Sequence, residues 1–278
     1  MNEFDKLRVI ATKIRKDIVE IVYNAKSGHP GGSLSCADIL TVLYFKQMRI
    51  RENDPKWDDR DRFVLSKGHC SPALYATLAR RGFFDLEDLK TFRKADSYLE
   101  GHPNMNYVKG VDMSTGSLGQ GISAACGMAL AGKIDKKDYR VYAILGDGEI
   151  EEGQVWEAFM SAAHYKLDNL TIFLDNNGLQ IDGEIKNVMS PNPIADKFKA
   201  FGFHVINIDG NDVWQIDNAI NESKKIKGKP TVIVAKTTKG KGVSFMENQV
   251  GWHGKAPSEE QRDIAFSELD KILSSLEE

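Results

Sequence analysis

The stretch VYAILGDGE, residues 141–149, consists of a largely apolar run followed by a Gly-Asp-Gly turn. A second apolar run at residues 170–174 is followed closely by Asn176 and Asn177. The 30 positions from Asp147 to Asn177 fit one turn, one helix and the next strand of a βαβ unit. The pattern therefore predicts two neighbouring strands whose carboxyl ends bring a carboxylate and a carboxamide together.

Asp147 and Asn177 carry the hard oxygen atoms that Mg²⁺ or Ca²⁺ prefers, and such a cation can hold a diphosphate. Gly146 and Gly148 allow a sharp turn and a close approach of phosphate oxygens, which would leave Asp147 exposed at the tip. The helix expected over residues 151–165 would aim its partly positive amino-terminal end at the same place. An ordinary strand-to-helix turn is also rich in Asp and Gly, so the asparagine pair is what favours a ligand site.

Strand-like and helical patterns alternate along the rest of the chain. Helices are expected at 4–25, 37–45, 71–82, 85–93, 119–134, 151–165, 213–226 and, as a polar tail, 258–276. Strands are expected at 62–65, 141–145, 170–174, 203–207 and 231–236. Loops are expected at 26–33, 66–69, 97–118 and, rich in glycine, 237–257. This alternation predicts an α/β fold, a mainly parallel sheet with helices on both faces, in a single domain over residues 1–278.

The composition is that of a globular protein, with 41% hydrophobic residues and a formal net charge of −3. Lysines are interspersed with acids, which argues against a nucleic acid partner. No apolar run approaches the roughly 18 residues of a membrane helix, and residues 1–17 are too charged for a signal peptide, so we expect a cytoplasmic protein. Cys36, Cys70 and Cys126 lack metal-type spacing and are expected to be free and mostly buried.

Histidines are concentrated in the expected loops. Four of the six, His29, His69, His102 and His253, lie in segments that contain Gly or Pro. Imidazole can donate hydrogen bonds to sugar hydroxyls and exchange their protons near neutral pH. A single loop histidine is more often solvated or structural, and the two remaining ones, at positions 164 and 204, are interpreted as structural.

The Gly-Asp-Gly and Asn-Asn pair resembles the diphosphate-binding signature of thiamine diphosphate enzymes. Five further motifs occur in the order seen in transketolases: SGHPG at 27–31, KGH at 67–69, GHP at 101–103, TGSLGQG at 115–121 and WHG at 252–254. The resemblance covers nearly all 278 residues and is to the amino-terminal half of transketolases. Residues 116–121 resemble a dinucleotide fingerprint, but no strand is expected before them, which argues against that interpretation.

The resemblance implies a set of cofactor contacts. The metal, Mg²⁺ with Ca²⁺ or Mn²⁺ as substitutes, would be held by Asp147, Asn177 and the backbone carbonyl of Leu179. The diphosphate would be contacted by His69 and Gly148, and the aminopyrimidine ring by the backbone of Gly116 and the side chain of Leu118. The other residues that the resemblance assigns to the cofactor are Ser117, Gly146, Glu149, Lys239 and His253.

The resemblance also implies a catalytic set. His29, His102 and His253 would line the donor-sugar channel. Glu152 would lie at a subunit interface and communicate with the glutamate that activates the cofactor, and Glu157 would be another interface acid.

The implied activity is that of a transketolase of the pentose phosphate pathway, which moves a two-carbon ketol unit from a ketose phosphate to an aldose phosphate. The activating glutamate and the pyrimidine-binding domain would belong to a separate carboxy-terminal subunit, with two copies of each chain in a heterotetramer. We therefore expect the isolated chain to bind diphosphate weakly and to be inactive.

Three positions depart from the transketolase pattern. Gly32-Ser33 replaces Ala-Pro, Leu99-Glu100 replaces Pro-Gly, and Lys239 replaces an isoleucine. These positions are expected near the donor channel, so a sulfonated or deoxy sugar remains open as the donor. The alternatives are another thiamine diphosphate enzyme, such as the alpha chain of a 2-oxo acid dehydrogenase or a deoxyxylulose phosphate synthase, and a non-catalytic regulatory half.

Overall fold

The computed structural model describes residues 1–277 and is built on a five-stranded sheet in the order β1-β2-β3-β7-β6. All neighbouring strands of this sheet are parallel. The strands are β1 (Arg62–Leu65), β2 (Val141–Gly146), β3 (Leu170–Asn176), β6 (His204–Asp209) and β7 (Thr231–Lys236). The predicted parallel α/β fold is therefore confirmed, and β2 and β3 are neighbours as the βαβ spacing indicated.

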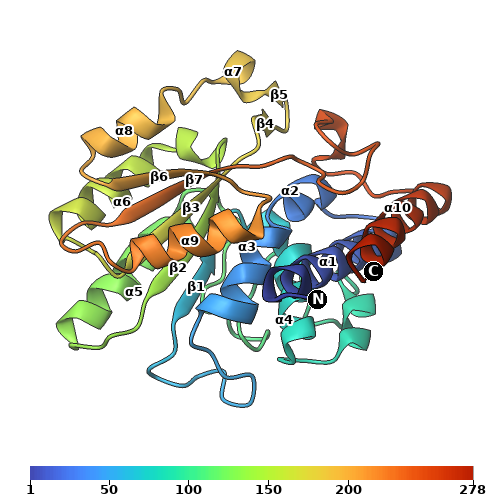
Figure 1. The fold of residues 1–278 in the computed structure, drawn as a ribbon, viewed down its shortest axis with the longest axis horizontal. Helices are drawn as coiled ribbons and strands as arrows, with labels where there is room; N and C mark the ends of the chain where they lie inside the picture. Colours follow the sequence, from blue (N-terminus) through green and yellow to red (C-terminus); the bar gives the residue numbers. More distant parts are fainter. Residues whose placement is uncertain (278) are drawn as a thin grey trace.

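Helices cover both faces of the sheet (Figure 1). Tyr142 and Ile144 of β2 belong to one apolar core, whereas Val141, Ala143 and Leu145 belong to the other, because successive side chains of a strand point to opposite faces. The first core is packed by α1 (Glu3–Ala25), α3 (Ala37–Val42), α4 (Ser71–Arg81) and α9 (Val213–Ser223). The second is packed by α5 (Gln120–Ile134), α6 (Gly153–His164) and α8 (Ile194–Ala200).

The last helix, α10 (Glu259–Glu277), lies beside α1 (Figure 1). Lys16 Nζ lies 2.5 Å from Asp270 Oδ1, and the Arg262 guanidinium stands 4.8 Å from the centre of the Tyr23 ring. Ala265 and Leu269 supply the buried face of this otherwise polar helix. The predicted tail helix thus closes the core over α1.

Several local predictions were wrong. The expected loop at 26–33 contains the start of a helix, α2 (Pro30–Ser35), for which Pro30 at the first helical position is preorganised. The helix expected to end at residue 45 is α3 followed by a π-helical turn, Leu43–Gln47. A 3₁₀ helix, Leu86–Thr91, stands where an α-helix was expected. The small hairpin of β4 (Leu179–Gln180) and β5 (Gly183–Glu184), and the short helix α7 (Ile185–Val188), were not predicted.

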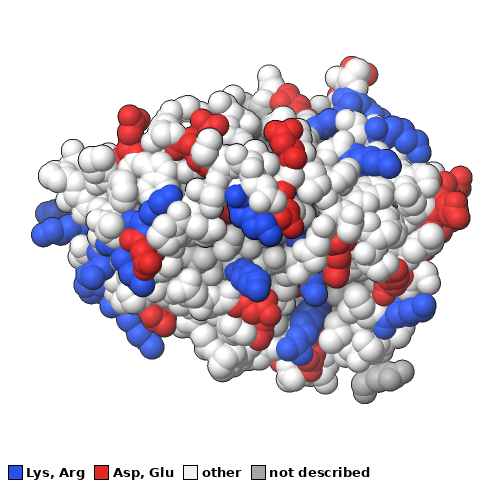
Figure 2. Space-filling view, turned by 90° about the horizontal axis from the view of Figure 1, so that it is seen from above, with Lys and Arg blue, Asp and Glu red and all other residues white. Residues whose placement is uncertain are grey.

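Other expectations concern single residues and surfaces. The three cysteines are free and buried, as predicted. Acidic and basic side chains are interspersed over the face drawn in Figure 2. Among the helices of residues 1–277, none is both long and apolar enough to cross a membrane.

Candidate active site

Four neighbouring strands, β1, β2, β3 and β7, end beside one pocket of about 280 Å³. The strand ends and the segments that follow them contribute Lys67 and His69, residues 146–149, Asn177 with residues 179–181, and Lys239, in the order of the strands. The site therefore lies at the carboxyl edge of a parallel sheet, where α/β proteins generally bind ligands. All of the predicted site residues line this pocket except His102, Ser117 and Glu152.

Asp147 is buried, with 2% of its surface exposed, so the expectation of an exposed tip was wrong. The backbone N–H of Gly178 donates to its Oδ2 at 2.5 Å and that of Gly148 to its Oδ1 at 3.0 Å. The loop after β3 thus folds over the loop after β2 and covers the carboxylate. Burial raises the pKa of Asp147 to about 7, partly offset by the Gly178 bond. A divalent cation at this carboxylate would compensate for the lost hydration.

The other expected metal ligands lie in the same loop. Asn177 Oδ1 accepts from the Leu179 backbone N–H at 3.1 Å, and Asn177 Nδ2 donates to Asp175 Oδ2 at 3.3 Å. The carbonyl of Leu179 accepts from Lys239 Nζ at 3.1 Å. The donor set is therefore a carboxylate, a carboxamide and a backbone carbonyl, which are hard oxygens that suit Mg²⁺ or Ca²⁺.

A buried ion pair between Lys67 and Asp175 lies beside the pocket. Lys67 Nζ donates to Asp175 Oδ2 at 2.5 Å and to the Gly32 carbonyl at 2.8 Å. Asp175 also accepts from the hydroxyls of Ser35, at 2.6 Å, and Thr237. Burial opposes both charges, but the pairing outweighs it, so the pKa of Lys67 lies well above its ordinary value and that of Asp175 below. The pair places a fixed positive group at the edge of the pocket.

Glu149 holds three loops of the site together. Its carboxylate accepts from Ser66 Oγ and from the backbone N–H groups of Gly119, at 3.0 Å, and Gly146, at 3.1 Å. The side chain is buried, and burial raises its pKa. Glu149 lines the pocket, but these hydrogen bonds direct its carboxylate to the protein itself.

Three imidazoles that line the pocket form a cluster. The rings of His69 and His253 stack with centres 5.3 Å apart, and His29 stands edge-on to them at 5.2 and 5.5 Å. Burial, with nearby cations, lowers the pKa of His29 and of His253 to about 4 and that of His69 well below its ordinary value. All three rings are therefore neutral at pH 7. His29 Nδ1 is buried and has no hydrogen-bond partner within the described chain.

The remaining predicted residues lie around this pocket. A Cβ on Gly116, whose φ is +154°, would lie 2.9 Å from His102 Cδ2, so the two loops touch and only glycine fits between them. Burial lowers the pKa of His102. Ser117 is exposed, and Glu152 is an exposed residue that precedes the first turn of α6. That turn does not line the pocket, contrary to the expectation that it would point at the anion.

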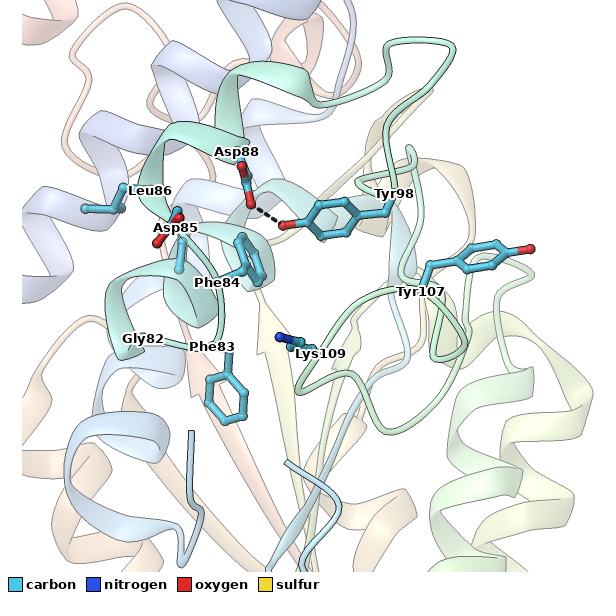
Figure 3. A pocket seen from close by; sticks show the side chains of 10 residues that line it. Gly82, Phe83, Phe84, Asp85, Leu86, Asp88, Tyr98, Tyr107 and Lys109 are labelled. Atoms are coloured by element: carbon cyan, nitrogen blue, oxygen red, sulfur yellow. Dashed lines mark hydrogen bonds between the residues drawn. The ribbon is translucent and has the colours of Figure 1, made fainter. Parts of the chain in front are cut away.

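A larger hollow of about 710 Å³ lies elsewhere, between the end of α4 and the loop that carries Tyr107 and Lys109 (Figure 3). Tyr98 donates to Asp88 Oδ2 across it at 2.6 Å. None of the predicted site residues lines this hollow. The gathered oxygen ligands, cations and histidines make the smaller pocket the candidate active site.

Sequence reasoning missed several pocket residues. Lys67 lies in a motif that was singled out, but nothing in the sequence indicated its partner Asp175. Gln180 and Ile181 come from the hairpin that was not predicted. Of the departures from the transketolase pattern, Gly32 and Lys239 do line the pocket, whereas the side chain of Leu99 is fully buried in the core.

The sequence of this chain is similar to those of known transketolase domains and subunits. The family model of the transketolase thiamine diphosphate binding domain matches residues 6–268. The chain is 44% identical, over 99% of its length and 98% of the relative's, to one of the subunits of the apulose-4-phosphate transketolase of Phocaeicola vulgatus. It is 46% identical, over 94% and 95% respectively, to a 6-deoxy-6-sulfo-D-fructose transketolase subunit of a Clostridium species.

Full-length transketolases are matched over part of their length. The human enzyme is 44% identical over 97% of this chain but only 43% of its own. The crystal structure of transketolase from Campylobacter jejuni superposes with a TM-score of 0.91 at 37% identity, covering 97% of this chain and 43% of that one.

Proposed function

This chain belongs to the family of transketolase thiamine diphosphate-binding domains, and from that premise we propose that it is the cofactor-binding subunit of a two-subunit transketolase. The observation that carries the proposal is the meeting of Asp147, Asn177 and the Leu179 carbonyl beside a cluster of neutral histidines. Oxygen ligands suit a metal-bound diphosphate, and neutral imidazoles suit a polyhydroxy substrate.

Different side chains of the pocket have different roles in binding the cofactor. Asp147, Asn177 and the Leu179 carbonyl would hold Mg²⁺, and Lys239 and Lys67, the latter paired with Asp175, would be available to donate to the diphosphate. Thiamine diphosphate, when bound, supplies the carbon nucleophile that makes and breaks the carbon–carbon bond.

Neutral histidines orient the sugar. His29 lines the pocket. Its Nδ1 is buried and has no partner within the described chain, so it meets a substrate hydroxyl only if the ring turns, and making that bond would recover about 1–3 kcal/mol.

The pocket fits a site shared with another chain. Glu152 is exposed, so it is free to meet a partner surface. Two relatives that the chain matches nearly end to end are described as transketolase subunits. A separate polypeptide would then supply the pyrimidine-binding half and the activating glutamate.

The names of two relatives indicate the chemical class of the donor sugar. One is named for apulose 4-phosphate and the other for 6-deoxy-6-sulfo-D-fructose. Both names describe a ketose with an anionic group away from the ketol end. We infer a donor of this class, with the ketol end at the histidines of this chain and the anionic end on the partner chain.

The test is a two-carbon transfer assay with this chain, its partner chain, thiamine diphosphate and Mg²⁺. Apulose 4-phosphate, 6-deoxy-6-sulfo-D-fructose and an unbranched ketose phosphate would be compared as donors. We expect transfer in the mixture, none from either chain alone, and at least a tenfold loss in Asp147→Asn, by analogy with the roughly 10–100-fold effect of disturbing a metal site. Asp182→Asn, at an exposed position of the nearby hairpin, is the matched control.

Two results would contradict the proposal. One is full activity of the isolated chain, which would show that no partner is needed. The other is a stable complex that binds thiamine diphosphate but transfers no two-carbon unit from any donor tested.

A further inference from the structure

Lys239 is a buried cation with two partners in the pocket. Only 2% of its surface is exposed. Its Nζ lies 3.1 Å from the Leu179 carbonyl oxygen and 2.9 Å from His253 Nδ1. The ammonium therefore joins the loop of the expected metal ligands to a histidine of the sugar channel.

The surrounding backbone is shaped around this side chain. A Cβ on Gly31 would lie 3.2 Å from Lys239 Cγ and 2.8 Å from the carbonyl oxygen of Trp252. The Gly240 backbone N–H donates to the Gly31 carbonyl at 2.9 Å, which fixes the loop of Lys239 against α2. Because the stem is confined in this way, the position of Nζ is set by packing as well as by its hydrogen bonds.

The direction of the Lys239–His253 hydrogen bond follows from the chemistry of the two groups. An ammonium has three N–H donors and no acceptor. Burial lowers the pKa of Lys239. With the lysine protonated, His253 Nδ1 accepts from it, and an accepting ring nitrogen carries no proton. The proton of the neutral ring then sits on Nε2. Burial, followed by the neighbouring Lys239, lowers the pKa of His253 to about 4, which keeps the ring neutral at pH 7.

We propose that Lys239 is a positioning residue that fixes His253 as its Nε2–H tautomer, so that His253 presents a hydrogen-bond donor to an oxygen of the bound sugar. The sugar rests on the function proposed above, whereas the tautomer is a property of this chain alone. A fixed donor selects an acceptor oxygen at that point, such as the carbonyl of the ketose, and it disfavours a substrate that presents only a donor there.

Lys239 also couples the loop of the expected metal ligands to His253. The same ammonium bonds the Leu179 carbonyl, an expected metal ligand, so displacement of the metal loop would also release His253. An apolar side chain at position 239 could make neither bond.

The experiment is nuclear magnetic resonance of the full chain labelled with ¹⁵N-histidine, using long-range ¹H–¹⁵N correlations that report which ring nitrogen is protonated. His253→Gln identifies the His253 signals by their disappearance. In the unsubstituted chain at pH 7 we expect the Nε2–H pattern and a titration midpoint near the pKa of about 4. The other titratable groups that face His253 are His29, His69 and Lys67.

Lys239→Met keeps the length of the stem but removes the donor. We expect this variant to populate the Nδ1–H form and to raise the His253 midpoint by about one pH unit or more. Lys241→Met, a half-exposed lysine on the same loop, should leave both quantities unchanged.

A His253 ring with Nδ1–H in the unsubstituted chain would overturn the proposal without any variant. Identical tautomer and midpoint in Lys239→Met and the unsubstituted chain would overturn it as well. These readouts need neither substrate nor partner. A failed transfer assay with the expected tautomer would therefore reject the proposed function alone, and the reverse result would reject this inference alone.

Discussion

Replacing Lys67 by methionine is the perturbation whose size the structure defines most directly. The Lys67 and Asp175 side chains are 2% and 0% exposed, and Nζ lies 2.5 Å from Oδ2. Lys67→Met preserves the aliphatic stem but leaves the carboxylate with the hydroxyls of Ser35 and Thr237 and the Asn177 amide as partners. Removing one member of a buried ion pair costs about 3–5 kcal/mol of unfolding free energy, because the other charge stays buried.

The assay is urea and thermal unfolding of the chain followed by circular dichroism. For a chain of this size, about 3–5 kcal/mol corresponds to a fall in Tm of roughly 6–20 °C. The pKa of Asp175 is lowered in the folded chain, so its stabilisation is present above the unfolded pKa of about 3.9 and is lost as pH falls through the folded value. Measurement at pH 7 therefore records the whole effect.

Two further variants test the cause. Adding Asp175→Asn to Lys67→Met removes the stranded charge and should restore about 2 kcal/mol or more, since pairs in contact are not additive. Lys137→Met removes an exposed pair with Asp59, whose side chains are 42% and 47% exposed, and should leave the unfolding free energy nearly unchanged. A loss below about 1 kcal/mol in Lys67→Met, or an additive double variant, would refute the reasoning.

Three further predictions concern the pocket. His29 and His253 have folded pKa values near 4, below the unfolded value of about 6.5. Acidification from pH 6.5 to 4 should therefore lower the unfolding free energy by roughly 1–2 kcal/mol for each ring, after allowance for solvent screening. His253→Gln should remove the contribution of that ring, as measured by urea unfolding against pH. Asp147→Asn should weaken Mg²⁺ binding at least about tenfold, or about 1.4 kcal/mol, in calorimetric titration with thiamine diphosphate present. Gly116→Ala should lower the unfolding free energy by about 1–3 kcal/mol, because the φ of +154° and the contact with a neighbouring ring exclude a Cβ. Gly127→Ala, which has open space at its Cβ, should instead stabilise α5 by about 0.5–1 kcal/mol in thermal unfolding.

Each of these has a clear contrary result. An acid slope unchanged by His253→Gln would mean that this ring titrates normally. Undiminished Mg²⁺ affinity in Asp147→Asn would remove the carboxylate from the ligand set. Equal stabilities of Gly116→Ala and the unsubstituted chain would show that the loop adapts to a side chain.

The sheet and the position of the site could be predicted from the sequence because both depend on local patterns. Largely apolar runs of five residues followed by turn residues define β2 and β3, and their spacing makes them neighbours. Once two strands are parallel neighbours, residues just past their carboxyl ends must lie at one edge. Asp147 and Asn177 were found in this way, and the motif loops were assigned by family resemblance.

Burial and pairing depend on segments far apart in the chain. Asp147 is covered because the backbone after β3 folds over it, and no local pattern records that contact. Lys67 and Asp175 are 108 positions apart in the sequence, and from the sequence alone each would be predicted to be an exposed charge.

The sequence by itself determined the parallel α/β sheet, the edge at which the ligands gather and the residue types present there, because these follow from periodicity and strand order. Only the tertiary structure decided which charges are buried, which ion pair lies beside the pocket and which nitrogen of His253 faces Lys239. Those properties depend on distances and on the exclusion of water, and packing sets both after the chain has folded.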